Sequence, residues 1–210
     1  ANGALITVSS GEFTVDNDIN LANVTVNSGA KLTVNQGKSL NVGTLTLESG
    51  VNGTATVVDA GTLATTTANV KQYLTSGRNW YVSSPVAGAS ASVLNTGTSV
   101  VYYNEPEARW DTEAGSLLVG KGYITVNTAS TGTVSFSGTL NSGEKTVALT
   151  RTAGKAKEGF NLIGNPFPSY LNAMTAINGQ SNIEKTIWYR TRNGSNSYVF
   201  DAVNTTTGVG

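Results

Sequence analysis

Four acidic side chains, one arginine and one tryptophan lie close together near the middle of the chain: Glu105, Glu107, Arg109, Trp110, Asp111 and Glu113. Paired carboxyl groups hydrolyse glycosidic bonds, in which one acts as the acid and the other as base or nucleophile. Clustered carboxylate oxygens also bind calcium. The indole of tryptophan offers a flat face to a sugar ring, whose hydroxyl groups the arginine and the carboxylates would bond. These six residues form the candidate ligand-binding site, and residues 105–113 are called the acidic segment below.

A solvated turn explains the same residues without a ligand. Pro106 lies within the acidic segment, and proline among charged residues is typical of a loop between two strands. The sequence favours this interpretation over a site. We therefore expect no catalytic residue, no resident cofactor and no metal centre, although calcium binding stays open.

A second motif, at residues 115–122, nearly matches a phosphate-binding loop. Its sequence is Gly-Ser-Leu-Leu-Val-Gly-Lys-Gly, but the position after Lys121 must carry a hydroxyl group for magnesium and is Gly122. A strand pattern follows where a phosphate site needs the start of a helix. The motif predicts a bend that enters the strand at Tyr123.

Composition excludes several classes of chemistry. The 210 residues include no cysteine and no histidine, which excludes thiolate catalysis, Ser-His-Asp triads and cysteine-ligated zinc. Thirteen basic and thirteen acidic side chains give zero net charge, so we expect neither a nucleic-acid partner nor membrane insertion. Thr, Ser, Asn and Gly supply the polarity instead, which favours strands and tight turns. The sequence predicts an all-β fold.

A repeat of roughly 20 residues fills the first third of the chain. Apolar-Thr-apolar triplets recur in a first column at residues 6–8, 24–26 and 45–47. A second column recurs at residues 13–15, 32–34 and 55–57, and Ser-Gly corners stand between the columns at 10–11, 28–29 and 49–50. The repeat predicts a short parallel β-helix, or solenoid, of about three rungs, with a weaker third side on each rung.

Because side chains alternate along a strand, the apolar members of each triplet should fill the interior and the threonines should face outward. The expected threonine columns are Thr7, Thr25 and Thr46, and Thr14, Thr33 and Thr56. Regular hydroxyl groups on a flat face also suggest binding to ice or another lattice. Each strand offers one threonine rather than a pair, so strand propensity is the simpler explanation.

The chain changes character after residue 67. Fifteen of the sixteen aromatic residues lie between Tyr73 and Phe200. We therefore expect a solenoid domain at residues 1–67 and a jelly-roll-like antiparallel β-sandwich at residues 68–210. Adjacent aromatic pairs in the second domain fit a sandwich core and its cover, or a carbohydrate platform.

The second domain contains an internal similarity. Residues 77–85 resemble residues 159–166, and residues 100–103 match residues 186–189, each followed by a turn and a returning aromatic strand. The first copy continues through Gly-Lys-Gly-Tyr at residues 120–123, which has no counterpart in the second. We expect a second copy that is cut short, and a chain that is part of something longer.

Residues 159–169, with residues 120–123 and 136–140, resemble the region that precedes the C-terminal sorting domain in large secreted proteins of Bacteroidetes-type bacteria. The resemblance covers roughly residues 77–210. Such proteins are often exported to the cell surface by a dedicated secretion system, and many are described as adhesin-like. The resemblance implies a secreted, surface-located β-sandwich module and implies no reaction. It leaves the mode of anchoring open, because the sorting domain itself is not found.

Two functions remain open at this point. The first is a non-enzymatic, exported, adhesin-like module that presents a β-surface to a glycan or to a host or neighbouring protein. The alternative is a carbohydrate-active enzyme or carbohydrate-binding module that uses the acidic segment and Trp110. The oligomeric state stays open in both.

Overall fold

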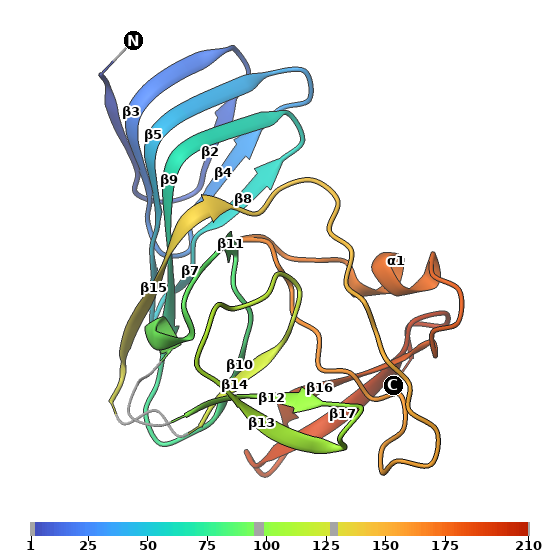
Figure 1. The fold of residues 1–210 in the computed structure, drawn as a ribbon. Coiled ribbons are helices and arrows are strands. Elements are labelled where there is room, and N and C mark those ends of the chain that lie inside the picture. Colours follow the sequence, from blue (N-terminus) through green and yellow to red (C-terminus); the bar gives the residue numbers. More distant parts are fainter. Residues whose placement is uncertain (1–2, 95–98, 127–129, 210) are drawn as a thin grey trace. The chain divides into compact units, whose positions relative to one another are not determined.

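The computed structural model describes residues 3–94, 99–126 and 130–209, and most of its regular structure is β-strand. The chain divides into two compact units, residues 1–169 and residues 170–210. The first unit contains a solenoid of about three turns and a separate antiparallel sheet (Figure 1). The expected all-β architecture is confirmed.

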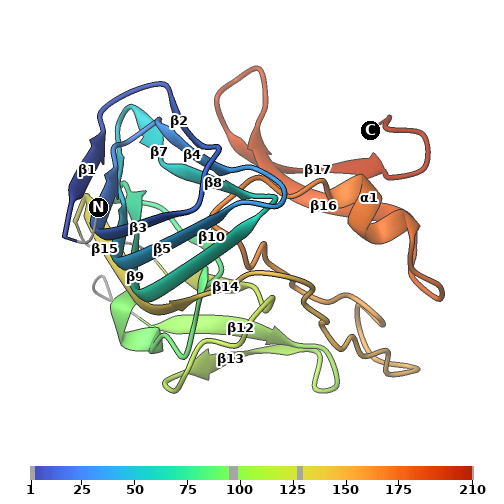
Figure 2. The same ribbon diagram turned by 90° about the horizontal axis from the view of Figure 1, so that it is seen from above.

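Two parallel sheets form the solenoid. The first contains, in order, β1 (Leu5–Val8), β3 (Ile19–Val26), β5 (Ser39–Leu47) and β9 (Thr62–Leu74). The second contains β2 (Glu12–Val15), β4 (Lys31–Val34) and β8 (Thr56–Asp59). Viewed from above, equivalent strands of successive rungs run alongside one another (Figure 2).

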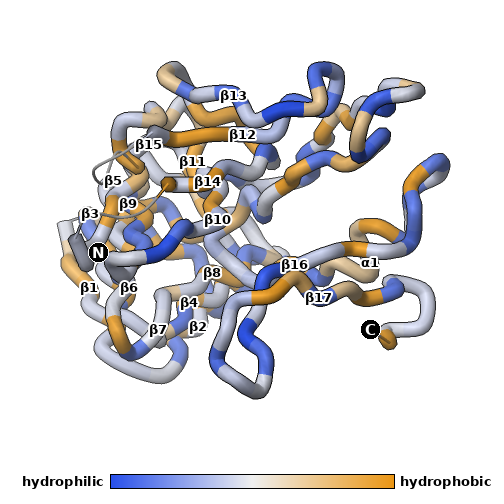
Figure 3. The backbone as a smooth tube through the Cα atoms, turned by 90° about the horizontal axis from the view of Figure 1, so that it is seen from below, coloured by the Kyte–Doolittle hydropathy of each residue, from blue (hydrophilic) through white to orange (hydrophobic). Residues whose placement is uncertain are grey.

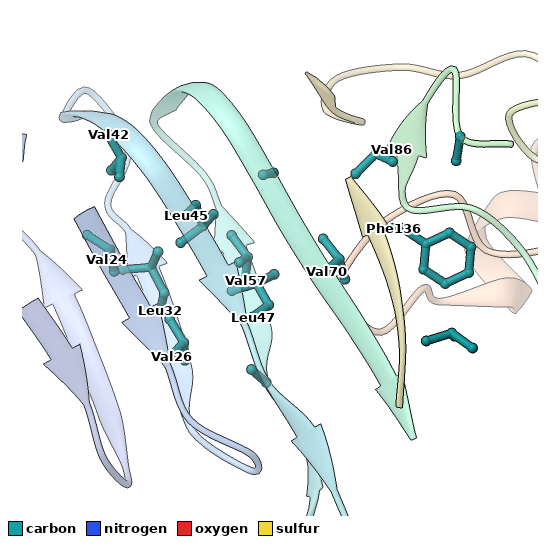
Figure 4. Packing of buried hydrophobic residues seen from close by; sticks show 14 of the residues in the cluster. Val24, Val26, Leu32, Val42, Leu45, Leu47, Val57, Val70, Val86 and Phe136 are labelled. Atoms are coloured by element: carbon teal, nitrogen blue, oxygen red, sulfur yellow. The ribbon is translucent and has the colours of Figure 1, made fainter. Parts of the chain in front are cut away.

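Apolar side chains from both sheets fill the interior of the solenoid (Figure 4). Leu32 and Val34 from the second sheet and Leu45 and Leu47 from the first are fully buried. Every second residue of these strands is apolar and points inward, as the triplets predict. Burial of a leucine of this kind contributes about 1.5–3 kcal/mol.

The first threonine column is confirmed, and one member of the second is wrong. Thr7, Thr25 and Thr46 lie opposite one another in register. In the second sheet, however, Thr33 lies opposite Val58, and Thr56 lies opposite Lys31. The shift arises because the third rung inserts a small hairpin, β6 (Ser49–Gly50) and β7 (Gly53–Thr54), between its columns.

The third side of each rung is not a separate element. In β3 and β5 it continues into the first-column triplet as one strand with a bend at Ala22 and Gly43, which the register omits. The bend brings the two backbones together, since a Cβ on Gly43 would lie 2.6 Å from the carbonyl oxygen of Ala22.

The first sheet extends past the solenoid. The later half of β9 pairs antiparallel with β15 (Gly132–Leu140), which pairs with β11 (Val86–Ala87). Phe136 of β15 is buried with Val70 and Val86 (Figure 4). The boundary predicted after residue 67 therefore falls inside β9, and the compact units divide after Ser169 instead.

A four-stranded antiparallel sheet completes the first unit. Its order is β10 (Trp80–Val82), β14 (Tyr123–Thr125), β12 (Val100–Asn104) and β13 (Arg109–Glu113). A short 3-10 helix, η1 (Ala91–Leu94), lies between β11 and β12 in the chain.

The second unit contains one helix and one hairpin. The helix α1 (Ala173–Asn178) begins at Asn172, whose side chain accepts a hydrogen bond from the backbone N–H of Thr175. The strands β16 (Thr186–Arg192) and β17 (Tyr198–Asn204) form a two-stranded antiparallel sheet. Figure 3 colours the end of β16 and the turn after it as hydrophilic. Across the described part of the chain, no helix has the length and apolar character needed to span a membrane.

Candidate functional site

The acidic segment forms the turn and the second strand of the β12–β13 hairpin. Tyr103 lies opposite Trp110, and Tyr102 lies opposite Asp111. Because successive side chains of a strand face opposite sides of the sheet, Trp110 faces away from Arg109 and Asp111. The structure therefore does not bring the six expected residues together, because Arg109, Asp111 and Glu113 lie on the opposite face of the sheet from Trp110.

Glu105 is a structural anchor. Its side chain is 3% exposed, and its Oε1 accepts hydrogen bonds from the backbone N–H groups of Gly159 and Thr152 at 2.8 and 2.7 Å. Its Oε2 accepts a further bond from the hydroxyl of Thr152. These bonds, the one from Gly159 first, lower the pKa of Glu105 to about 2. The carboxylate thus holds the loop of residues 152–159 against the hairpin.

The carboxylates of β13 are also held by neighbouring groups. Asp111 accepts hydrogen bonds from the side chains of Asn104 and Arg109 at 2.6 and 2.7 Å, which lower its pKa. Glu113 accepts a bond from the backbone of Gly115 and lies 3.9 Å from the ammonium group of Lys121. A glycosidase needs one carboxyl group with a raised pKa to protonate the leaving group. Glu105 and Asp111 have the opposite property and stay ionised.

Trp110 keeps the capacity for stacking that the sequence indicates. The indole is 46% exposed and meets the ring of Tyr103 edge to face, with 5.4 Å between the centroids. The hydroxyl of Tyr103 donates a hydrogen bond to the carbonyl of Ala156, which fixes the supporting ring. The pair offers a pre-positioned aromatic surface at the edge strand of the sheet.

Residues 115–122 form a bend that leads into β14, as predicted. Gly120 accepts a backbone hydrogen bond from Gly164, and Gly122 donates one to Leu162. The ammonium group of Lys121 lies 3.1 Å from the ring centroid of Tyr102, an arrangement that is favourable for a cation and an aromatic face. The ammonium group of Lys121 thus contacts an aromatic ring of the sheet. A strand, β14, follows the motif where a phosphate-binding loop needs a helix.

Sequence reasoning missed a hollow of about 190 Å³ at the end of the solenoid. It is lined by Val57, Asp59, residues 140–143 and residues 167–169. Burial raises the pKa of Asp59, and Phe167 supplies an aromatic wall. The lining comes from three segments that are distant in sequence, so no local motif could reveal it.

Asp59 is the sole acidic side chain among these lining residues, so the hollow does not contain the pair of carboxyl groups that glycoside hydrolysis uses. Within residues 3–94, 99–126 and 130–209, no group of three or more acidic side chains is placed to hold a metal ion.

The family comparison covers almost the whole chain. A family model described as a domain of unknown function, DUF8693, matches residues 3–207. The chain belongs to this family. The DUF8693 match spans the solenoid, the four-stranded sheet and the β16–β17 hairpin, so both compact units lie within one family domain. No curated protein and no solved structure matches the chain.

Proposed function

We propose that this chain is a non-enzymatic module of an exported cell-surface protein, and that it presents strand-borne aromatic side chains to a glycan. The observation that carries the proposal is the exposed Trp110 of β13, which packs edge to face on the half-buried Tyr103 of β12. Half-exposed indole rings supported by a second ring are suited to stacking on the apolar face of a sugar.

The surrounding chemistry favours binding over hydrolysis. Glu105 is buried and bonded to three donors, and Asp111 is bonded to Asn104 and Arg109. The aromatic pair sits on a sheet whose other strands are anchored by buried residues, Tyr123 among them. A rigid platform loses little conformational entropy when a ligand binds.

Surface location is supported by the resemblance of residues 159–169 to exported proteins and by composition. A chain of 210 residues without cysteine has no thiol to be oxidised outside the cell. The low charge content, 12% of residues, and the many Thr, Ser and Asn residues are compatible with a scaffold that displays strands.

A glycan array with the full chain tests the proposal, followed by affinity measurements on the retained glycans. Trp110→Ala should weaken binding at least about tenfold, because it removes the stacking surface. Tyr170→Ala is the matched control, since Tyr170 is 93% exposed and lies in the other unit. Unchanged glycan binding in Trp110→Ala would contradict the assignment of this surface.

A second measurement separates binding from catalysis. Glu107 lies at the exposed turn of the hairpin, and Glu107→Ala should leave glycan affinity within about threefold of the wild-type value. Release of reducing sugar by the wild-type chain, lost in Glu107→Ala or in Glu113→Gln, would overturn the non-enzymatic proposal.

A further inference from the structure

The hollow at the end of the solenoid contains a carboxylate at a position that is apolar in the other rungs. In the second sheet, Val15 lies opposite Val34, and Val34 lies opposite Asp59. Both valines are fully buried in the interior of the solenoid. Because side chains alternate along a strand, Asp59 faces the same side as the buried Val57, whereas Val58 between them is exposed. The third rung therefore turns a carboxylate toward the core side of the sheet, where it lines the hollow.

The protein supplies no opposite charge to Asp59. Within residues 3–94, 99–126 and 130–209, its carboxylate makes no ion pair and accepts no hydrogen bond. Burial raises the pKa of Asp59, and no neighbouring charge opposes that effect. None of the residues that line the hollow is basic. Asp59 also keeps exposed surface, so a cation from outside can reach the carboxylate.

A second oxygen atom without a partner lines the same hollow. Asn141 is 4% exposed, and its Nδ2 donates hydrogen bonds to the carbonyls of Ser84 and Pro166 at 3.2 and 3.0 Å. Exchanging the amide nitrogen and oxygen would place an acceptor against two carbonyl oxygens, so these bonds fix the orientation of the amide.

The other end of this amide is available to a ligand. In the described part of the chain, Oδ1 of Asn141 accepts no hydrogen bond, although the oxygen is not fully enclosed by protein. Buried polar groups are ordinarily hydrogen-bonded. Because Asn141 lines the hollow, a ligand there can donate the missing bond to Oδ1.

The remaining walls of the hollow are largely apolar. Phe167 contributes an aromatic ring, and Val57, Leu140 and Pro168 contribute aliphatic surface. An aromatic ring attracts a cation, and aliphatic surface suits the methylene stem that carries one. The volume of about 190 Å³ is below the range of about 300–1,000 Å³ that is usual for drug-sized ligands. The hollow therefore fits the end of one side chain better than a whole ligand.

We propose that the hollow binds the protonated amine of a lysine side chain, which a partner protein supplies. The ammonium group has three donors and one positive charge. Asp59 supplies the opposite charge and Asn141 the acceptor, while the methylene stem lies along the apolar walls. Calcium suits the hollow less well, because it takes about six to eight oxygen ligands and Asp59 is the sole acidic side chain among the lining residues. The inference goes beyond glycan binding and does not use Trp110.

The probe is Nα-acetyl-lysine N-methylamide, and the target is the full chain at neutral pH. Two-dimensional NMR follows the backbone amides of Ser142 and Gly143, which line the hollow. We expect saturable shifts with a Kd of about 1–10 mM, since the probe has few atoms. The norleucine counterpart lacks the ammonium group and should bind at least about tenfold more weakly. Absence of saturable shifts at both amides up to about 100 mM lysine probe would overturn the proposal.

Three further probes separate the proposed ligand from its alternatives. The trimethylated lysine probe keeps the charge but has no N–H, so it should bind at least about threefold more weakly. Glucosamine carries its ammonium group on a sugar ring, and calcium chloride supplies a cation without a stem. Both should bind more weakly than the lysine probe. Equal affinity of the trimethylated probe would contradict the role of Asn141 as acceptor, and tighter binding of glucosamine or calcium would contradict lysine as the ligand.

On the protein, Asp59→Asn removes the charge and keeps the shape of the side chain. It should weaken binding of the lysine probe at least about tenfold. Asp16→Asn is the matched control, because Asp16 is an exposed residue that does not line the hollow, and its affinity should stay within about twofold of wild type. A folded Asp59→Asn chain with wild-type affinity for the lysine probe would contradict the proposed site.

A measurement on the wild-type chain needs no substitution. Carbon-detected NMR titration follows the carboxyl group of Asp59 with and without saturating lysine probe. An ammonium group in contact with the carboxylate should lower the pKa of Asp59. The same pKa in both titrations would show that the amine does not bind at this carboxylate.

Discussion

Glu105 shows how one buried carboxylate can join segments that are distant in sequence. It lies at the end of β12, and it accepts hydrogen bonds from Thr152 and Gly159 in a loop about fifty residues later. That loop has no regular secondary structure. The hydrogen bonds to the carboxylate fix the position of this loop, as the backbone hydrogen bonds of a helix or strand would do elsewhere.

The pH dependence of stability should report on this carboxylate. The folded pKa of Glu105, about 2, lies below its ordinary value of 4.5. Its contribution to stability is therefore complete above pH 4.5 and is lost as the pH falls toward 2. We expect the melting temperature of the wild-type chain to fall more steeply over this window than that of Glu105→Gln.

Thermal unfolding followed by circular dichroism at several pH values measures both slopes. The variant should keep a smaller slope, because hydrogen bonds also lower the pKa values of Glu12, Asp18, Asp111 and Glu158. Identical slopes for the two chains would show that the Glu105 carboxylate is not anchored as described.

Asn141 is the second residue on which distant segments converge. Asn141→Ala leaves the carbonyls of Ser84 and Pro166 without this donor in a buried environment. The free energy of unfolding should fall by about 1–3 kcal/mol. Urea denaturation measures the change, with the exposed Asn20→Ala as the control, expected within about 0.5 kcal/mol of wild type. Equal effects of the two substitutions would argue against Asn141 as the buried donor that links the carbonyls of Ser84 and Pro166.

The residue types of the acidic segment were visible in the sequence, but the single site expected from them does not form, because the strand turns its side chains to opposite faces of the sheet. Strand alternation separates Trp110 from Arg109 and Asp111 as soon as the turn is placed before Arg109. The partners of Glu105 could not be predicted, because they lie in a loop with no pattern of its own. The stacking surface was predictable because it needs only the cross-strand pair of Tyr103 and Trp110.

At the scale of elements, the rungs follow the spacing of the triplets wherever that spacing is regular. The threonines of the first column, Thr7, Thr25 and Thr46, pair in the register that the triplets predict. The second column failed at Thr56, because the β6–β7 hairpin changes the length of the third corner. Ala30 and Ala55 are both buried just before β4 and β8, and aligning them gives the observed register.

At the bend of its rung, Gly43 lies too close to the backbone of the neighbouring rung for a larger residue. A Cβ on Gly43 would lie 2.6 Å from the carbonyl oxygen of Ala22, a backbone atom that cannot easily move. Gly43→Ala should therefore lower the free energy of unfolding by about 1–3 kcal/mol. Gly132→Ala in β15 is the control, because no atom lies within 4 Å of its added Cβ. Chemical denaturation compares the two, and equal stability would mean that the rungs are not tightly stacked at the bend.

At the scale of the molecule, the two compact units differ in what each buries. The large hydrophobic cluster lies wholly within residues 1–169. In the described part of the second unit, Ile177 is the buried hydrophobic residue, and the sheet has two strands. An isolated two-stranded hairpin is at best marginally stable in water.

Expression of the separate units tests this difference. Residues 1–169 alone should give a β-rich circular dichroism spectrum and a cooperative urea transition. Residues 170–210 alone should show neither. A cooperative transition in the shorter piece would show that α1 and the β16–β17 hairpin form a sufficient core.

Composition placed the domain boundary after residue 67, shortly before the aromatic-rich region that begins at Tyr73, whereas the chain divides into two compact units after Ser169. Composition reflects the side chains available for packing. A boundary depends on where strand pairing stops, and β9 continues into pairing with β15 without a break. The all-β class was accessible because it depends on local propensity, summed over many residues.

The antiparallel strand β15 covers the edge of β9 that faces away from β5, so the stack of parallel rungs ends there and can be lengthened between its two ends. A tandem copy of residues 19–39 reproduces the offset between β3 and β5, in which Ile19 lies opposite Leu40. Each inserted copy would add one rung of about 4.8 Å, while β9 and the strand β15 that covers it stay unchanged. The protein could thus serve as a molecular ruler whose height is set by counting copies.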